Sequence, residues 1–170
     1  ANTVWAFSTA GVSAPALFEN FAAEMPANVA AFTPKALSNI VWAYATAGVE
    51  APAVFDAVAA YAPKRMAQFK ARSLAKLVHA YATARIAAPA LFAAVAAEAL
   101  EKIQEFTANE LATTVWAFAK AGVEAPALFE AFAEQGPAKI AECRSQDLSR
   151  TAWAYSKAGV AAPALFEAVA

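Results

Sequence analysis

"LSNIVWAYATAGVEAPAVF" (residues 37–55) occurs again, with few changes, as "LATTVWAFAKAGVEAPALF" at residues 111–129. The tryptophans follow a step of 37 residues, with a histidine in the third place: Trp5, Trp42, His79, Trp116 and Trp153. Prolines follow the same step: Pro15, Pro52, Pro89, Pro126 and Pro163. A tandem repeat therefore decides the fold, because each unit has to bury its apolar face against its neighbours.

The composition has to be interpreted through this repeat. Hydrophobic residues make up 61% of the chain, and the mean hydropathy is +0.42, largely because alanine is so frequent. The longest stretch without a charge, residues 1–18, contains Gly11 and Pro15, so we expect no membrane insertion, which requires about 20 consecutive apolar residues. The net charge of −1 gives no global basic signature for nucleic acid. A single cysteine excludes an intrachain disulfide framework.

The unit at residues 33–69 contains the signals of a helix start and a helix end. Thr33 is a suitable N-cap, and Pro34 follows at the first helical position, where its missing N–H costs nothing. Gly48 lies where a left-handed residue would end this first helix, and the next unit has Arg85 in its place. We therefore predict that the first helix begins after Thr33 and ends before Gly48.

A second helix is predicted to open at the proline of each "APA" motif. Three later prolines should break or kink it, with a short third helix as an alternative after the break: Pro26, Pro63 and Pro137. Leu100 replaces that proline once and should let the helix continue. The expected fold is all-α, an α-solenoid of antiparallel helix pairs that forms a single segment. Its units are 1–32 (partial), 33–69, 70–106, 107–143 and 144–170 (partial). Neither end has a polar capping unit, so we expect a fragment of a longer chain.

The side of the first helix opposite Leu37 is polar when the chain is plotted at about 100° per residue. The residues on that side, here called the polar stripe, are Asn2, Thr9, Lys35, Asn39, Thr46, Arg72, Lys76, Thr83, Asn109, Thr113, Lys120, Gln146, Arg150 and Lys157. The stripe holds six Lys or Arg and no Asp or Glu. Most acidic residues belong instead to the loops and second helices, so the two kinds of helix differ in charge.

Stacking of the units would align the polar stripe into one continuous surface, usually on the inner side of a solenoid. Its side chains vary from unit to unit, whereas the core positions barely change. Helical-repeat proteins that bind single-stranded RNA use two or three variable side chains per unit to contact each base. We therefore expect the polar stripe to bind single-stranded RNA. The alternative is that a solvated face has drifted among Lys, Asn, Thr and Arg, although drift should also have admitted acids.

The tryptophans allow two interpretations. They could stack on bases, or they could pack between neighbouring first helices against small side chains such as Ala43 and Ala47, which we favour. His79 is then a core substitution, and Cys143 a small buried hydrophobe. No carboxylate pair or nucleophile–base spacing supports catalysis, so we expect no enzymatic activity, no cofactor and no metal ion.

The pattern "L-x-x-x-V-W-A-[FY]-[AS]-[TK]-A-G" followed by "APALF" resembles heptatricopeptide and octotricopeptide repeats over the whole chain. It stands here as "LSNIVWAYATAG" (37–48), "LATTVWAFAKAG" (111–122) and "LSRTAWAYSKAG" (148–159), with a degraded copy at 74–85. The resemblance implies an α-solenoid that binds RNA through its first helices in organellar RNA metabolism, in a mitochondrion or a chloroplast. The alternative is a scaffold or structural subunit of a large organellar assembly, for example a ribosome, that binds protein subunits or rRNA.

Overall fold

All regular elements of the described chain are helices. The structure, a computed structural model, describes residues 2–11, 14–139 and 142–169, and within them it contains α-helices and short 3-10 helices but no strand. The predicted all-α class is therefore confirmed. Of the helices in these residues, none is both long and apolar enough to span a membrane.

The α-helices alternate along the chain between two sets. The first helices are α1 (Asn2–Thr9), α3 (Pro34–Ala47), α5 (Ala71–Ala84), α7 (Ala108–Ala121) and α9 (Ser145–Ala158). The second helices are α2 (Pro15–Glu24), α4 (Pro52–Tyr61), α6 (Pro89–Glu101), α8 (Pro126–Lys139) and α10 (Pro163–Val169). Short 3-10 helices follow three of them: η1 (Pro26–Ala31), η2 (Ala62–Gln68) and η3 (Ile103–Glu105).

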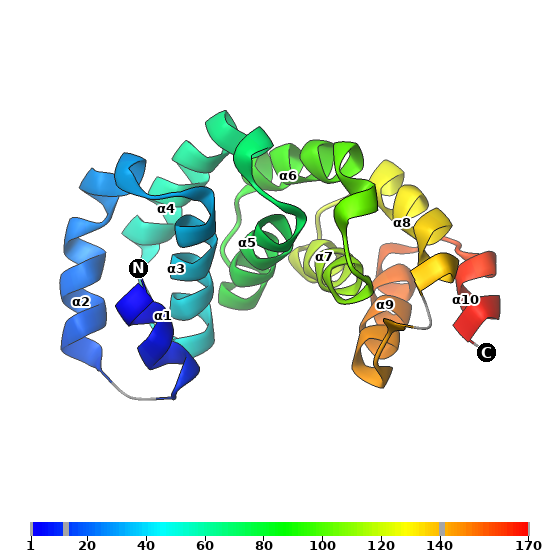
Figure 1. The fold of residues 1–170 in the computed structure, drawn as a ribbon, viewed down its shortest axis with the longest axis horizontal. Helices are drawn as coiled ribbons and strands as arrows, with labels where there is room; N and C mark the ends of the chain where they lie inside the picture. Colours follow the sequence, from blue (N-terminus) through cyan, green and yellow to red (C-terminus); the bar gives the residue numbers. More distant parts are fainter. Residues whose placement is uncertain (1, 12–13, 140–141, 170) are drawn as a thin grey trace.

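The two sets form two rows. Neighbouring first helices pack side by side, α1 on α3, α3 on α5, α5 on α7 and α7 on α9. Figure 1 shows an arch in which α4, α6 and α8 follow the outer side, while α5 and α7 lie on the inner side. The first helices therefore form the inner row and the second helices the outer row.

The first helices begin and end where their sequence predicts. The Thr33 side chain accepts a hydrogen bond from the backbone N–H of Ala36, at 3.2 Å, and caps α3. Gly48 ends α3 with a φ of 66°, and Arg85 ends α5 with a φ of 58°. Both residues are left-handed, a conformation in which a β-carbon is unfavourable. The residue that ends the first helix is thus left-handed even where it is an arginine.

The second helices follow the proline prediction except in α8. α2 stops before Pro26, α4 stops before Pro63, and 3-10 helices follow both, so the short third helix is present. Leu100 lets α6 continue to Glu101. Pro137, however, lies inside α8, so of the predicted break or kink the break does not occur there. The residue before a proline normally avoids the helical region because its β-carbon meets the proline ring, and Gly136 has no β-carbon.

The buried core joins each first helix to the second helix before it. Tyr44, Tyr81 and Tyr155 are fully buried in first helices, and each hydroxyl donates a hydrogen bond to a backbone carbonyl of the preceding second helix. The pairs are Tyr44–Phe18 at 2.6 Å, Tyr81–Phe55 at 2.6 Å and Tyr155–Phe129 at 2.7 Å. Phe118 occupies the corresponding position of α7, where its ring contacts Phe92 but no hydroxyl is available.

Two lysines add polar links between successive outer elements. Lys102 donates hydrogen bonds to the carbonyl oxygens of Ala67 and Phe69, at 2.7 and 2.8 Å. Lys139 stands 37 residues later and donates in the same way to the carbonyl oxygen of Phe106. These carbonyls end a 3-10 helix, where no helical N–H is available to them, so each lysine acts as an inter-unit cap.

Candidate nucleic-acid interface

The inner row brings the polar stripe into one surface. Exposed stripe residues are Thr9, Lys35, Thr46, Arg72, Lys120, Gln146 and Lys157. Half-buried ones are Asn39, Lys76, Thr83, Asn109, Thr113 and Arg150. Asn2 belongs to α1, but its side chain lies outside the described residues. The half-buried members lie mostly along the middle of the stripe, where neighbouring first helices meet.

The stripe cations are not neutralised by carboxylates. Within the described parts of the chain, the ion pairs are Lys102–Glu98 and Arg144–Asp147, and neither includes a stripe residue. Acidic side chains of the second helices are exposed on the outer row, as in the case of Glu19, Asp56, Glu130 and Glu167. The sorting of charge seen in the sequence therefore becomes a sorting of surfaces, with a basic inner row and an acidic outer row.

The most basic part of the stripe is a groove between α3 and α5. It encloses a cavity of about 860 Å³, whose lining includes Lys35, Lys70, Arg72 and Lys76 and no carboxylate. Burial lowers the pKa of Lys76, and the neighbouring charges of Arg72 and Lys35 lower it further. Because these like charges repel one another, a phosphate that entered the groove would relieve the repulsion.

Lys76 is held in place by two contacts with α3. Its ammonium donates a hydrogen bond to Asn39 Oδ1 at 2.9 Å, and it lies 5.3 Å from the centre of the Trp42 ring. A cation over the face of an indole is stabilised by the ring quadrupole. Trp42 is half-buried and thus positions a stripe cation that comes from the next first helix.

The junction of α5 and α7 is built from rings. His79 stacks on Trp116 with ring centroids 5.1 Å apart and an interplanar angle of 29°. Lys120 and Arg150 approach the same indole, at 4.5 and 5.7 Å from its centre. Burial, followed by the charges of Arg150 and Lys120, lowers the pKa of His79 to about 4. The imidazole is therefore neutral at physiological pH.

These contacts change the interpretation of the tryptophan column. Trp42 and Trp116 are partly buried and pack against the core, and they also contact neighbouring first helices through cations and a ring, whereas Trp153 is 44% exposed. The Trp5 side chain lies outside the described residues. His79 was predicted to be a core residue, but it is half-buried. Its column faces the edge of the stripe and not the second helices.

Cys143 also differs from its prediction. It is half-buried, not buried, and its thiol contacts the carbonyl oxygen of Lys139 at 3.7 Å. The thiol is shorter than the phenyl ring of Phe106, which stands in the same column and reaches Phe132. Burial raises the pKa of Cys143, and the charges of Asp147 and Glu142 raise it further.

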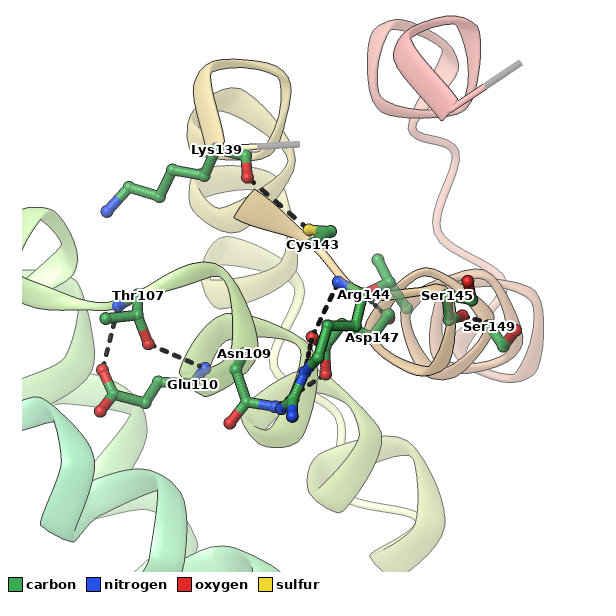
Figure 2. A network of polar contacts seen from close by, with 10 residues as sticks. Thr107, Asn109, Glu110, Lys139, Cys143, Arg144, Ser145, Asp147 and Ser149 are labelled. Atoms are coloured by element: carbon green, nitrogen blue, oxygen red, sulfur yellow. Dashed lines mark hydrogen bonds and ion pairs between the residues drawn. The ribbon is translucent and has the colours of Figure 1, made fainter. Parts of the chain in front are cut away.

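Asp147 is a site residue that the sequence did not reveal. Figure 2 shows it in the first turn of α9, facing α7, where it accepts hydrogen bonds from Asn109 Nδ2 at 2.7 Å and from the backbone N–H of Arg144 at 3.1 Å. Its burial alone would raise the pKa, but these hydrogen bonds and the Arg144 charge hold the pKa of Asp147 below its usual range. The buried carboxylate thereby fixes the orientation of Asn109, a stripe residue.

The arrangement as a whole offers cations, amides and aromatic rings to a ligand. In the part of the chain that the structure describes, no group of His, Cys, Asp and Glu could hold a metal ion. Comparison with protein families gives one match, to a family described as RNA-editing substrate-binding complex 6 protein, over residues 1–170. No curated protein matches the chain.

Proposed function

The chain belongs to the RNA-editing substrate-binding complex 6 family, and from this premise we propose that it binds single-stranded RNA along its inner row. The observation that carries the proposal is the groove between α3 and α5, where Lys35, Lys70, Arg72 and Lys76 converge without a carboxylate. In a chain with a net charge of −1, four converging cations need a specific cause, and a polyanionic ligand supplies one.

The fold supports the same proposal. We interpret the two rows as a segment of an α-solenoid with a 37-residue repeat, similar to heptatricopeptide and octotricopeptide repeats, with unit boundaries at residues 33, 70, 107 and 144. At one base per unit, the segment would contact about four or five bases. The stripe residues of each first helix would touch base edges, and the cations would hold the phosphates.

We further propose that the protein acts within a larger assembly and not as an enzyme. The family description names a complex that binds the substrate of RNA editing, which supports a role as one RNA-binding subunit among several. The acidic outer row would then remain available to other subunits. We propose a mitochondrion or a chloroplast as the location, a proposal that is supported by the resemblance to organellar repeat families.

The test is a binding titration with a pool of short single-stranded RNAs across a salt series. The variant Lys76→Glu, Arg150→Glu reverses two stripe charges. The control Lys64→Glu, Arg85→Glu changes the net charge equally at two exposed residues outside the stripe. We expect the log–log salt slope of the parent to approach about −0.7 per phosphate contacted, and the stripe variant to lose at least about tenfold in affinity.

Two results would contradict this proposal. Equal losses in the stripe variant and the control would mean that only net charge matters. No loss in the stripe variant would mean that RNA, if bound, lies elsewhere, and the scaffold alternative would then be preferred. Circular dichroism of both variants establishes that they keep the helical content of the parent.

A further inference from the structure

We propose that the junction of α3, α5 and α7 contains a pocket for one unpaired nucleobase, a proposal that rests on RNA binding by the inner row. An open cavity of about 390 Å³ lies at this junction. Small-molecule sites typically measure about 300–1,000 Å³, so one nucleotide is a suitable occupant. Residues from four first helices line it: Trp42, Arg72, Ala75, Lys76, His79, Asn109, Glu110, Thr113 and Arg150.

Two aromatic side chains from different helices form part of the wall. Trp116 in α7 covers one face of the His79 ring at 5.1 Å. Trp42 in α3 lines the same cavity as His79. A base placed there would meet the neutral imidazole and the indole, and each stacking contact is worth about 1–3 kcal/mol.

Polar groups in the cavity match the rest of a nucleotide. Nδ1 of His79 is buried and has no hydrogen-bond partner in the described part of the chain. Asn109 donates through Nδ2 to Asp147, and Figure 2 shows its carbonyl oxygen turned away from that carboxylate. Because Nδ1 lies in the plane of a ring whose face would stack on the base, it is the Asn109 carbonyl oxygen that can accept a hydrogen bond from the edge of that base. The cations Arg72, Lys76 and Arg150 supply contacts for the adjacent phosphates.

A nucleobase suits this cavity better than an acidic peptide segment does. The cations alone would attract either ligand. Glu110 also lines the cavity, where its Oε2 accepts a hydrogen bond from the backbone N–H of Thr107 at 3.0 Å; the carboxylate can accept a further hydrogen bond from the amino group of a base, which ionised Asp and Glu side chains cannot donate. A peptide made of Asp and Glu has no aromatic ring that could stack on the imidazole, whereas every base has a π face that can do so.

The decisive experiment compares two oligomers of five nucleotides at one salt concentration. One is single-stranded RNA, and the other has the same ribose-phosphate backbone without bases. We expect the parent to bind the base-bearing oligomer at least about tenfold more tightly. His79→Ala should reduce this preference about fivefold or more, while its affinity for the abasic oligomer stays unchanged. Trp42→Ala should also reduce the preference and should weaken both oligomers, because Trp42 positions Lys76 as well. Trp153→Ala alters an exposed tryptophan in the same column and should keep the preference of the parent.

The outcomes separate this proposal from RNA binding itself. A parent that binds neither oligomer contradicts the proposed function, and the pocket with it. If the parent binds both equally, or if His79→Ala weakens both equally, the pocket is wrong while the basic stripe stands. An acidic peptide that binds the parent more tightly than the base-bearing oligomer also overturns the pocket. Trp42→Phe keeps a ring in the wall and should retain most of the preference, which guards against a variant that simply fails to fold.

Discussion

The α3–α5 and α5–α7 junctions occupy equivalent places in the inner row but are built differently. At the first, Lys76 lies over Trp42 and bonds to Asn39. At the second, the equivalent of Lys76 is Thr113, which offers no cation, and the indole of Trp116 meets His79 directly. The α3–α5 contact is therefore a cation over a ring, whereas Trp116 meets the His79 ring of α5 and is also approached by two cations, Lys120 and Arg150.

The same contrast extends into the core. Tyr81 in α5 donates a hydrogen bond to the carbonyl oxygen of Phe55, whereas Phe118 in α7 reaches Phe92 with its ring alone. The α5–α7 side thus replaces two polar contacts of the α3–α5 side with aromatic ones. Residues that are candidates for RNA binding also join the units, so binding and stability should respond together when these residues are changed.

The largest expected effect comes from truncating the two core rings. Tyr81→Ala and Phe118→Ala each remove a fully buried ring and should lower the free energy of unfolding by about 3–5 kcal/mol. Tyr81→Ala should cost about 1 kcal/mol more, because it also leaves the Phe55 carbonyl without its donor. Urea unfolding followed by circular dichroism measures both values. A Phe118→Ala variant that is the less stable of the two would contradict the comparison.

A smaller effect is expected from pH, and only at the α5–α7 junction. His79 is the single histidine of the chain, and its native pKa of about 4 lies below the usual value of 6.5 for a histidine. The unfolded state therefore binds the proton first as pH falls, so stability is lost between about pH 6.5 and 4. With allowance for screening at a half-buried ring, the loss should reach up to about 2 kcal/mol.

His79→Phe provides the control for this effect. The phenyl ring can still stack on Trp116 but does not titrate, so urea unfolding of the variant should depend less on pH over this range. The pKa of Asp147 is held below its usual range, so the stability that Asp147 contributes is lost mainly at lower pH. Equal pH dependence in parent and variant would exclude His79 as the cause.

Local signals in the sequence predicted the helices well, because caps and helix ends depend on a few adjacent residues. Thr33 and Gly48 mark the ends of α3 as expected. Arg85 keeps the left-handed conformation because its neighbours fold as they do in the other units. Pro137 does not end α8, because Gly136 before it has no β-carbon to meet the proline ring.

The site was less predictable, because its contacts depend on how neighbouring helices align. Lys76 and Trp42 are 34 residues apart, and only the packing of α5 on α3 brings them together. Asp147 has the sequence context of an ordinary first-turn acid, yet α7 and α9 enclose it and Asn109 satisfies its charge. The sequence pattern predicted the polar stripe but not which of its side chains contact one another.

The smallest expected effect comes from exchanging the two core residues by which the junctions differ, Tyr81 and Phe118. The Phe92–Phe118 rings are 5.0 Å apart at 78°, close to the 5.1 Å and 84° of Phe55 and Tyr81, so a hydroxyl on residue 118 would reach an equivalent place. Phe118→Tyr should therefore gain about 1 kcal/mol in the free energy of unfolding, and Tyr81→Phe should lose a similar amount. Urea unfolding of both variants and of the double variant measures the exchange. Destabilisation by Phe118→Tyr would show that α7 packs too closely on α6 for a hydroxyl, and that its phenylalanine is required by space and not by chance.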